Sequence, residues 1–192
     1  MEGQKMIEVR WHGRGGQGAV VASRILALAA YTDGYKGVQA FPFFGMERRG
    51  APVLAFTRMS RDEIRIRNQV YEPDVVVVLD PLLPKIVEVT GGLKPKCYIV
   101  LNSRLKPSEV KWAKNYKTAT VDAVSISKKL NLKVAGFQVF NTPMLGALAR
   151  ATKLVKIASV KKAIIDYFGE KRGKTNTEAA EIAYENTFFS EG

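Results

Sequence analysis

Cysteine and histidine are almost absent from this sequence of 192 residues, which contains one of each, Cys97 and His12. A disulfide needs two cysteines, and a structural zinc site or an iron–sulfur cluster needs about four ligands. The chain by itself therefore cannot form an internal disulfide, a cysteine-ligated cluster or a histidine-rich metal site. If the protein takes part in redox or metal chemistry, we expect another chain to carry the centre.

Long hydrophobic runs are also lacking. No stretch approaches the roughly 20 apolar residues that a membrane-spanning helix needs, and no apolar signal segment follows residues 1–5. We therefore expect no membrane association and a cytoplasmic location. The length and the ordinary composition, 46% apolar and 25% charged, predict a single folded domain over residues 1–192.

Acidic residues are few relative to basic ones, 18 against 30, which gives a formal net charge of +12. This excess makes a basic nucleic-acid-binding module one alternative. The lysines are scattered, however, without a block of five or more like charges, and no nucleic-acid-binding motif is recognisable. We therefore favour a solvated, lysine-rich surface that faces acidic partners or reflects a thermophile-like composition, and we expect no nucleic-acid partner.

Glycine, by contrast, is concentrated between a predicted strand (6–11) and a predicted helix (19–30). The stretch between them consists of His12 followed by Gly13, Arg14, Gly15, Gly16, Gln17 and Gly18. Such a turn lets a ligand or another chain approach the backbone closely, and the first N–H groups of the helix are free to bind an anion. Three of the glycines also match the G-x-G-x-x-G fingerprint of dinucleotide-binding proteins.

The rest of that fingerprint is missing. A dinucleotide site requires an acidic residue about 20 positions after the glycines, but residues 37–42 contain no carboxylate, Asp33 comes too early and Glu47 too late. A free-standing dinucleotide-binding oxidoreductase is therefore a disfavoured alternative. The sequence also offers no nucleophile with an evident base, so we predict no catalytic residue on this chain.

Two continuous apolar runs, 75–79 and 97–101, are typical of strands buried on both faces of an α/β sheet. Asp80 and Asn102 follow them directly. Side chains at the carboxyl ends of such strands either line a ligand crevice or cap the next turn, and the sequence leaves both alternatives open.

The other predicted elements complete the fold class. Strands are expected at 38–44, 53–59, 64–67 and 118–121. Helices are expected at 82–89 and 123–130, at 141–151 with Asn141 as the polar cap, from Ser159, and from Thr175 or Asn176. Because 53–59 and 64–67 follow each other directly, we expect them to form a β-hairpin. The prediction is an α/β fold with a mixed, largely parallel open sheet flanked by helices, a β-hairpin insertion and a Rossmann-like glycine turn at the first strand.

A second unusual segment, residues 43–52, places adjacent arginines and a glutamate among large apolar side chains. Together with residues 12–18, 73–81 and 141–148, it makes the sequence similar to the gamma subunits of pyruvate (2-oxoacid) ferredoxin oxidoreductases, in particular the pyruvate and branched-chain (2-ketoisovalerate) enzymes. The resemblance covers roughly residues 7–185.

The resemblance implies a multisubunit enzyme that converts a 2-oxoacid, coenzyme A and oxidised ferredoxin into acyl-CoA, carbon dioxide and reduced ferredoxin. Thiamine diphosphate and Mg²⁺ would lie between alpha and beta subunits, and [4Fe-4S] clusters on the beta and delta subunits. The present chain would carry no cofactor and no metal, and would be inactive alone.

Two roles for the glycine turn remain open under this resemblance. The turn, residues 13–18, docks on the alpha and beta chains, or it lines the approach of coenzyme A, whose phosphates Arg14 and the helix N-terminus would attract. An interface role is also expected for the second segment, at Phe44, Glu47, Arg48, Arg49 and Gly50.

Overall fold

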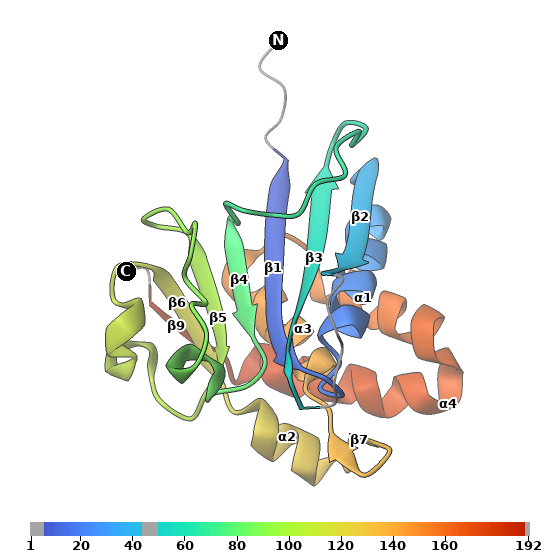
Figure 1. The fold of residues 1–192 in the computed structure, drawn as a ribbon. Helices are drawn as coiled ribbons and strands as arrows, with labels where there is room; N and C mark the ends of the chain where they lie inside the picture. The colour runs from blue at the N-terminus through green and yellow to red at the C-terminus, as the bar shows by residue number, and fades with distance from the viewer. Residues whose placement is uncertain (1–5, 44–49, 191–192) are drawn as a thin grey trace.

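The fold is built on a seven-stranded mixed sheet, seen face-on in Figure 1. A computed structural model describes residues 6–43 and 50–190. In spatial order the strands are β2 (Gly37–Pro42), β3 (Pro52–Ser60), β1 (Ile7–Arg14), β4 (Val75–Val78), β5 (Tyr98–Asn102), β6 (Lys117–Val121) and β9 (Phe188–Ser190). The four strands β1, β4, β5 and β6 run parallel at the centre, and antiparallel pairs lie at both edges. The predicted mixed, largely parallel open sheet is confirmed.

The hairpin lies elsewhere than predicted. β3 pairs with β2 on one side and with β1 on the other, so neither of its edges is left for residues 64–67, which form no strand. The Gln39 side chain on β2 instead donates to the carbonyl oxygens of Ile64 (3.4 Å) and Ile66 (3.1 Å). The prediction of a 53–59/64–67 hairpin was wrong, because the alternating pattern of 64–67 belongs to a segment held against the sheet by a side chain.

The central strands are buried on both faces, as their apolar runs predict. Val75 and Val77 of β4 face one hydrophobic cluster, and Val76 and Val78 face another. All four valines are buried, because neighbouring strands and the layers on both faces exclude water.

Helices cover one face of the sheet (Figure 1). They are α1 (Ala19–Thr32), α2 (Ala123–Lys129), α3 (Asn141–Thr152) and α4 (Ile157–Glu185). The fully buried Trp11 belongs to the larger cluster on this face, and its indole N–H donates to Thr57 Oγ1 at 3.0 Å. α3 and α4 approach so closely that a Cβ at Gly146 would collide with the carbonyl oxygen of Ala180.

The opposite face is covered by loops and short 3₁₀ turns. These turns are η1 (Leu83–Lys85), η2 (Pro107–Glu109) and η3 (Lys111–Ala113), and the predicted helix 82–89 is reduced to η1. A smaller apolar cluster lies beneath them. Two guanidinium groups, those of Arg10 and Arg58, are also buried on this face, with residue exposures of 8% and 0%.

The long helix α4 is folded back on itself. The backbone of Gly169 leaves the helical conformation (φ 74°, ψ 166°), and Lys161 Nζ then lies 2.9 Å from Glu181 Oε1, twenty residues later. Two antiparallel helical segments therefore pack side by side, as Figure 1 shows at its right-hand edge. Two helices were predicted here, but the second begins after Gly169 rather than at Thr175 or Asn176.

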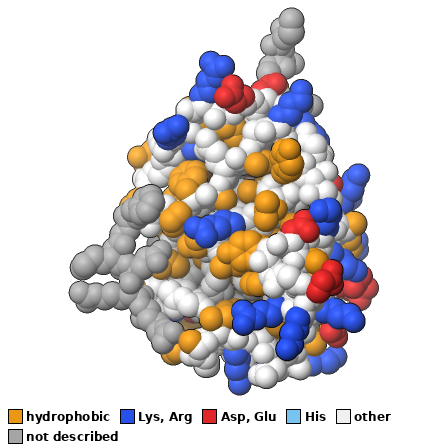
Figure 2. Space-filling model, turned by 90° about the vertical axis from the view of Figure 1, so that its right-hand side faces the viewer, with side chains coloured by type: hydrophobic (Ala, Val, Ile, Leu, Met, Phe, Trp, Pro, Cys, Tyr) orange, Lys and Arg blue, Asp and Glu red, His pale blue; other side chains and the backbone are white. Residues whose placement is uncertain are grey.

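The small hairpin of β7 (Lys133–Val134) and β8 (Phe137–Gln138) lies next to α2. On the face shown in Figure 2, Lys and Arg side chains are scattered among apolar and acidic ones rather than gathered into one stripe. Within residues 6–43 and 50–190, no helix is both long and apolar enough to cross a bilayer.

Candidate functional site at the glycine turn

Two glycines of the turn are required by packing within the chain. A Cβ at Gly13 would lie 3.1 Å from the Cβ of Ala19, and a Cβ at Gly18 would lie 3.0 Å from the side chain of Asn141 at the start of α3. Gly18 also adopts a positive φ of 91° at the N-cap of α1, where no side chain caps the helix. The turn is therefore compact because α1 and α3 pack directly against it.

The other two glycines face different surroundings. Gly15 pairs with the backbone near the end of the second segment: its N–H donates to Ala51 O at 3.0 Å, and its carbonyl accepts from Gly50 N–H at 3.2 Å. Gly16 is exposed, with a φ of 97°, and a Cβ there would meet nothing within 4 Å among the described residues. The exposed backbone at Gly16 is thus open to approach from outside.

A single carboxylate organises the side chains of the turn. Asp80 Oδ2 accepts from Arg14 Nε at 2.9 Å and from Gln17 Nε2 at 2.8 Å, and Asp80 Oδ1 accepts from Leu82 N–H at 2.8 Å. Gln17 Oε1 in turn accepts from Arg14 N–H at 2.8 Å. Arg14 Nη1 donates to Gly50 O at 3.1 Å, so the arginine connects both sequence motifs. Its side chain remains 27% exposed.

The contacts of Asp80 and Asn102 show which of their two possible roles they have, lining a ligand crevice or capping the next turn. Both oxygens of Asp80 are occupied by the chain's own donors, and Asn102 is buried between Leu79 O, to which it donates at 2.8 Å, and Ala123 N–H, from which it accepts at 3.1 Å. Asn102 ties the end of β4 to the beginning of α2. Both residues therefore stabilise the chain's own turns, which leaves Arg14 as the partly exposed charge of the cluster.

Sequence reasoning predicted the order of strand, glycine turn and helix, but β1 runs to Arg14, so Gly13 and Arg14 belong to the strand. It also missed some of the partners of these residues. It put Asp80 at a strand end without pairing it to Arg14, and it took Asn141 for a helix cap. The N-cap of α3 is Phe140, and Asn141 is the first helical residue, packed on Gly18. Phe44, Glu47, Arg48 and Arg49 lie outside the described residues, so of the second segment's predicted interface residues only Gly50 can be placed.

The topology also argues against a dinucleotide site at this turn. In the dinucleotide fold the strand that follows the first helix lies beside the first strand, whereas β3 separates β2 from β1 here. The end of β2 is therefore about 10 Å from β1, at roughly 4.8 Å per strand. It is thus not at the position beside β1 where that fold places its ribose-binding carboxylate.

His12 points away from the turn, onto the loop-covered face. Its Nε2 accepts from Arg10 Nε at 3.0 Å, and Arg10 Nη2 also donates to Val89 O (3.1 Å) and Gly91 O (2.6 Å). Burial, reinforced by the Arg10 charge, lowers the pKa of His12 from 6.5 to about 3. The imidazole is therefore neutral and supports the 87–91 segment. Across the described ranges, no group of three or more His, Cys, Asp or Glu residues could hold a metal ion.

Comparison with known proteins identifies the family. The model of the pyruvate ferredoxin/flavodoxin oxidoreductase family matches residues 8–186. The pyruvate/ketoisovalerate oxidoreductases common subunit gamma of Pyrococcus furiosus is 54% identical over 185 residues, which is 95% of this chain and 97% of that protein. The chain belongs to the gamma subunits of this family.

Two further gamma-type relatives agree along almost the whole chain. Pyruvate synthase subunit PorC of Methanocaldococcus jannaschii is 52% identical over 179 residues, covering 93% of this chain and 96% of the relative. The crystal structure of the pyruvate oxidoreductase subunit PORC of Thermotoga maritima superposes with a TM-score of 0.79 at 36% identity, covering 97% of this chain and 99% of that one. The mixed, largely parallel sheet is thus the fold of an experimentally solved gamma-type subunit.

Proposed function

We propose that this chain is the gamma subunit, without a cofactor of its own, of a cytoplasmic enzyme that oxidatively decarboxylates a 2-oxoacid. The enzyme would convert pyruvate or a branched-chain 2-oxoacid and coenzyme A into acyl-CoA and carbon dioxide, and pass two electrons to ferredoxin. Thiamine diphosphate, Mg²⁺ and the [4Fe-4S] clusters belong in this proposal to the alpha, beta and delta subunits. The observation that carries it is the 54% identity over 95% of the chain to a relative named as a common subunit gamma.

The side chains at the glycine turn support a role without chemistry on this chain. Asp80 has both oxygens occupied by internal donors, and His12 is buried, neutral and bonded to Arg10. Neither group is available as a general base. The chain acts in this proposal as one folded unit that assembles with the catalytic subunits.

We assign the assembly role to the exposed backbone of the turn and its neighbour Gly50. Gly16 and Gly50 both have positive φ angles (97° and 81°) and both are exposed, and a Cβ at either position would meet no atom of residues 6–43 and 50–190 within 4 Å. Because Gly15 bonds to residues 50 and 51, the two motifs present one continuous surface. Such a surface suits a partner chain that packs closely against glycine backbone.

Coenzyme A is the second candidate for this surface, and Arg14 is the observation that favours it. The guanidinium group is 27% exposed, and α1 begins nearby without a side-chain cap. A phosphate placed there would bind the arginine and the helix N-terminus together. The interface role is preferred because Arg14 already has Asp80 and Gly50 as internal partners.

Reconstitution of the complex with Arg14→Ala tests the proposal and separates the two roles. An interface role predicts at least about tenfold less recovered complex, equivalent to about 1.4 kcal/mol, with an unchanged KM for coenzyme A in the complex that does form. A coenzyme A role predicts normal assembly with a raised KM for coenzyme A. Arg65→Ala is the control, because that side chain is 85% exposed and pairs with Glu63.

Co-purification tests the proposed function itself. The tagged chain should bring down thiamine- and cluster-bearing subunits, and the purified assembly should reduce ferredoxin only with both a 2-oxoacid and coenzyme A. Comparison of pyruvate with 2-ketoisovalerate then shows whether one chain serves both enzymes. Isolation of the chain without such partners, or binding of NADH by the chain alone, would contradict the proposal.

A further inference from the structure

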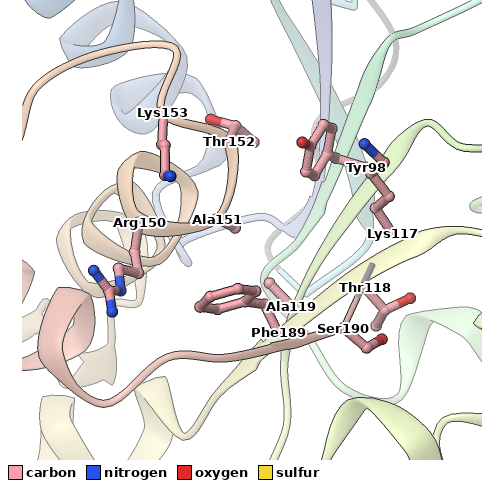
Figure 3. Close-up of a pocket in the computed structure, with 10 residues that line it drawn as sticks. All are labelled: Tyr98, Lys117, Thr118, Ala119, Arg150, Ala151, Thr152, Lys153, Phe189 and Ser190. Carbon is pink, nitrogen blue, oxygen red and sulfur yellow. The ribbon is translucent and has the colours of Figure 1, made fainter. Parts of the chain in front are cut away.

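A second concave site lies at the other end of the sheet, far from the glycine turn. Its walls come from the first residues of β5 and β6, the end of α3 and the edge strand β9, and its volume is about 120 Å³. Figure 3 shows Arg150 and Lys153 of the α3 end on one side, with Tyr98 and Lys117 on the other and Phe189 below them. Four segments distant in sequence therefore enclose one pocket.

The lining is strongly cationic. Lys117, Arg150 and Lys153 contribute three positive charges, and none of the ten described residues that line the pocket is acidic. No ion pair joins any of these three cations to a carboxylate in the described ranges. Like charges that line one small space repel each other, and a bound anion would relieve that repulsion.

The helix end explains only part of this arrangement. Cations in the last turn of a helix are favoured by the helix dipole, which accounts for Arg150 and for Lys153 at the C-cap of α3. Lys117 lies on β6, outside any helix, and its Nζ is 5.1 Å from the centre of the Tyr98 ring. The sheet therefore adds a third charge that α3 does not require.

Aromatic rings in and next to the pocket restrict two of the three cations, Arg150 and Lys117. The Arg150 guanidinium carbon lies 5.3 Å from the centre of the Tyr184 ring and 5.8 Å from that of Phe189. Cation–π contacts of this kind restrict long basic side chains without neutralising them. Two of the three cations, Arg150 and Lys117, are thus held beside aromatic rings without being neutralised.

The volume limits the size of the ligand. A cavity of about 120 Å³ holds roughly eight water-sized positions at about 15 Å³ each, whereas pockets for drug-sized ligands and cofactors measure roughly 300–1,000 Å³. Three cations match an anion with more than one negative charge. We propose that this pocket binds a small divalent oxyanion, a phosphate or a short dicarboxylate, in a site separate from the glycine turn.

Calorimetric titration of the full-length chain at pH 7.5 and constant ionic strength tests this proposal. The probes are inorganic phosphate, succinate, acetate and chloride. We expect saturable binding at one site for phosphate or succinate, and at least tenfold weaker binding for the two monovalent anions. The better of the two divalent probes then shows whether the site prefers a phosphate or carboxylate group.

Two variants connect the binding to the pocket. Lys153→Asn removes one charge and keeps a residue that tolerates the positive φ of 55° at this position, and Arg150→Gln removes another. Each should raise the dissociation constant at least tenfold while circular dichroism stays unchanged. Lys111→Gln is the matched control, since η3 packs on the opposite face of the sheet.

Three results would overturn the proposal: no saturable binding of either divalent anion, equal binding by wild type and both pocket variants, or an equal loss in the Lys111→Gln control. The titration uses the isolated chain and does not depend on the oxidoreductase activity. Its outcome is therefore distinguishable from that of the proposed function.

Discussion

The two faces of the sheet are stabilised in different ways. On the helix-covered face, Trp11 and the apolar residues of α1, α3 and α4 form a continuous hydrophobic cluster. On the loop-covered face the apolar cluster is small, and buried Arg10 and Arg58 bind the covering segments by hydrogen bonds. Helices can bury an apolar stripe, whereas irregular loops expose backbone carbonyls that need donors. Where the covering chain is irregular, a buried guanidinium group therefore fixes it to the sheet in place of a large apolar layer.

The largest loss of unfolding free energy is expected from Gly146→Ala, on the helix-covered face. A Cβ at this position would collide with the carbonyl oxygen of Ala180, so α3 and α4 must separate. We expect a loss of about 4 kcal/mol in unfolding free energy, or failure to fold, since overpacking against backbone is relieved only by moving a helix. Urea denaturation measures the change.

Gly91→Ala is the control for that substitution, because a Cβ there would make only ordinary contact with Glu88 Cγ at 3.5 Å. Its unfolding free energy should remain within about 0.5 kcal/mol of the wild type. Similar values for both variants would show that the helix-covered face is not closely packed at Gly146.

The second-largest loss of unfolding free energy is expected from Arg58→Met, on the loop-covered face. Arg58 Nε lies 2.7 Å from Glu8 Oε1, and Arg58 Nη2 donates to Asn68 Oδ1 and Gln69 O. Removal of the guanidinium leaves a poorly exposed carboxylate and two acceptors without their donor, which costs about 3 kcal/mol. Chemical denaturation measures this loss, and amide exchange in residues 62–70 should accelerate.

The double variant Arg58→Met with Glu8→Gln sharpens the same comparison. If the buried ion pair dominates, removal of the second charge should recover at least about 1 kcal/mol of the loss. Additive effects of the two substitutions would instead assign the stability of this face to packing alone.

His12→Gln is expected to change the unfolding free energy least at neutral pH. Its effect should grow as the pH falls. The pKa of His12 is about 3 in the folded protein and 6.5 when unperturbed, so the unfolded state binds a proton first as the pH falls. The unfolding free energy that results from keeping His12 neutral is fully present above pH 6.5. It is lost as the pH falls from 6.5 to 3, at about 1.4 kcal/mol per pH unit. His12→Gln keeps an acceptor for Arg10 but removes the titration.

The difference in unfolding free energy between His12→Gln and the wild type should therefore be nearly constant above pH 7 and shift in favour of the variant from pH 6 to 4. Denaturant titrations at four or five pH values measure this difference. A difference independent of pH would mean that His12 is not buried as a neutral group.

Much of the fold was predictable from local patterns. The valine run at 75–78 became a strand buried on both faces, and the order of strand, glycine turn and helix was predicted, although β1 runs to Arg14 and takes in the first two residues of the predicted turn. The missing carboxylate in residues 37–42 already argued against a dinucleotide site. Local patterns failed where partners came from distant segments: residues 64–67 alternate like a strand, but β1 and β2 occupy both edges of β3.

Residue identity and short-range spacing were enough to show the family resemblance and the strand and helix types of the long periodic segments, and the single cysteine and single histidine were enough to exclude an internal disulfide or a cysteine-ligated cluster. Only the tertiary structure decided that Asp80 holds Arg14 and Gln17, that Asn141 packs on Gly18, and that Lys117 joins Arg150 and Lys153 in one pocket. Each of these contacts joins segments more than 30 residues apart, and their positions are set by sheet order and helix packing rather than by local preference.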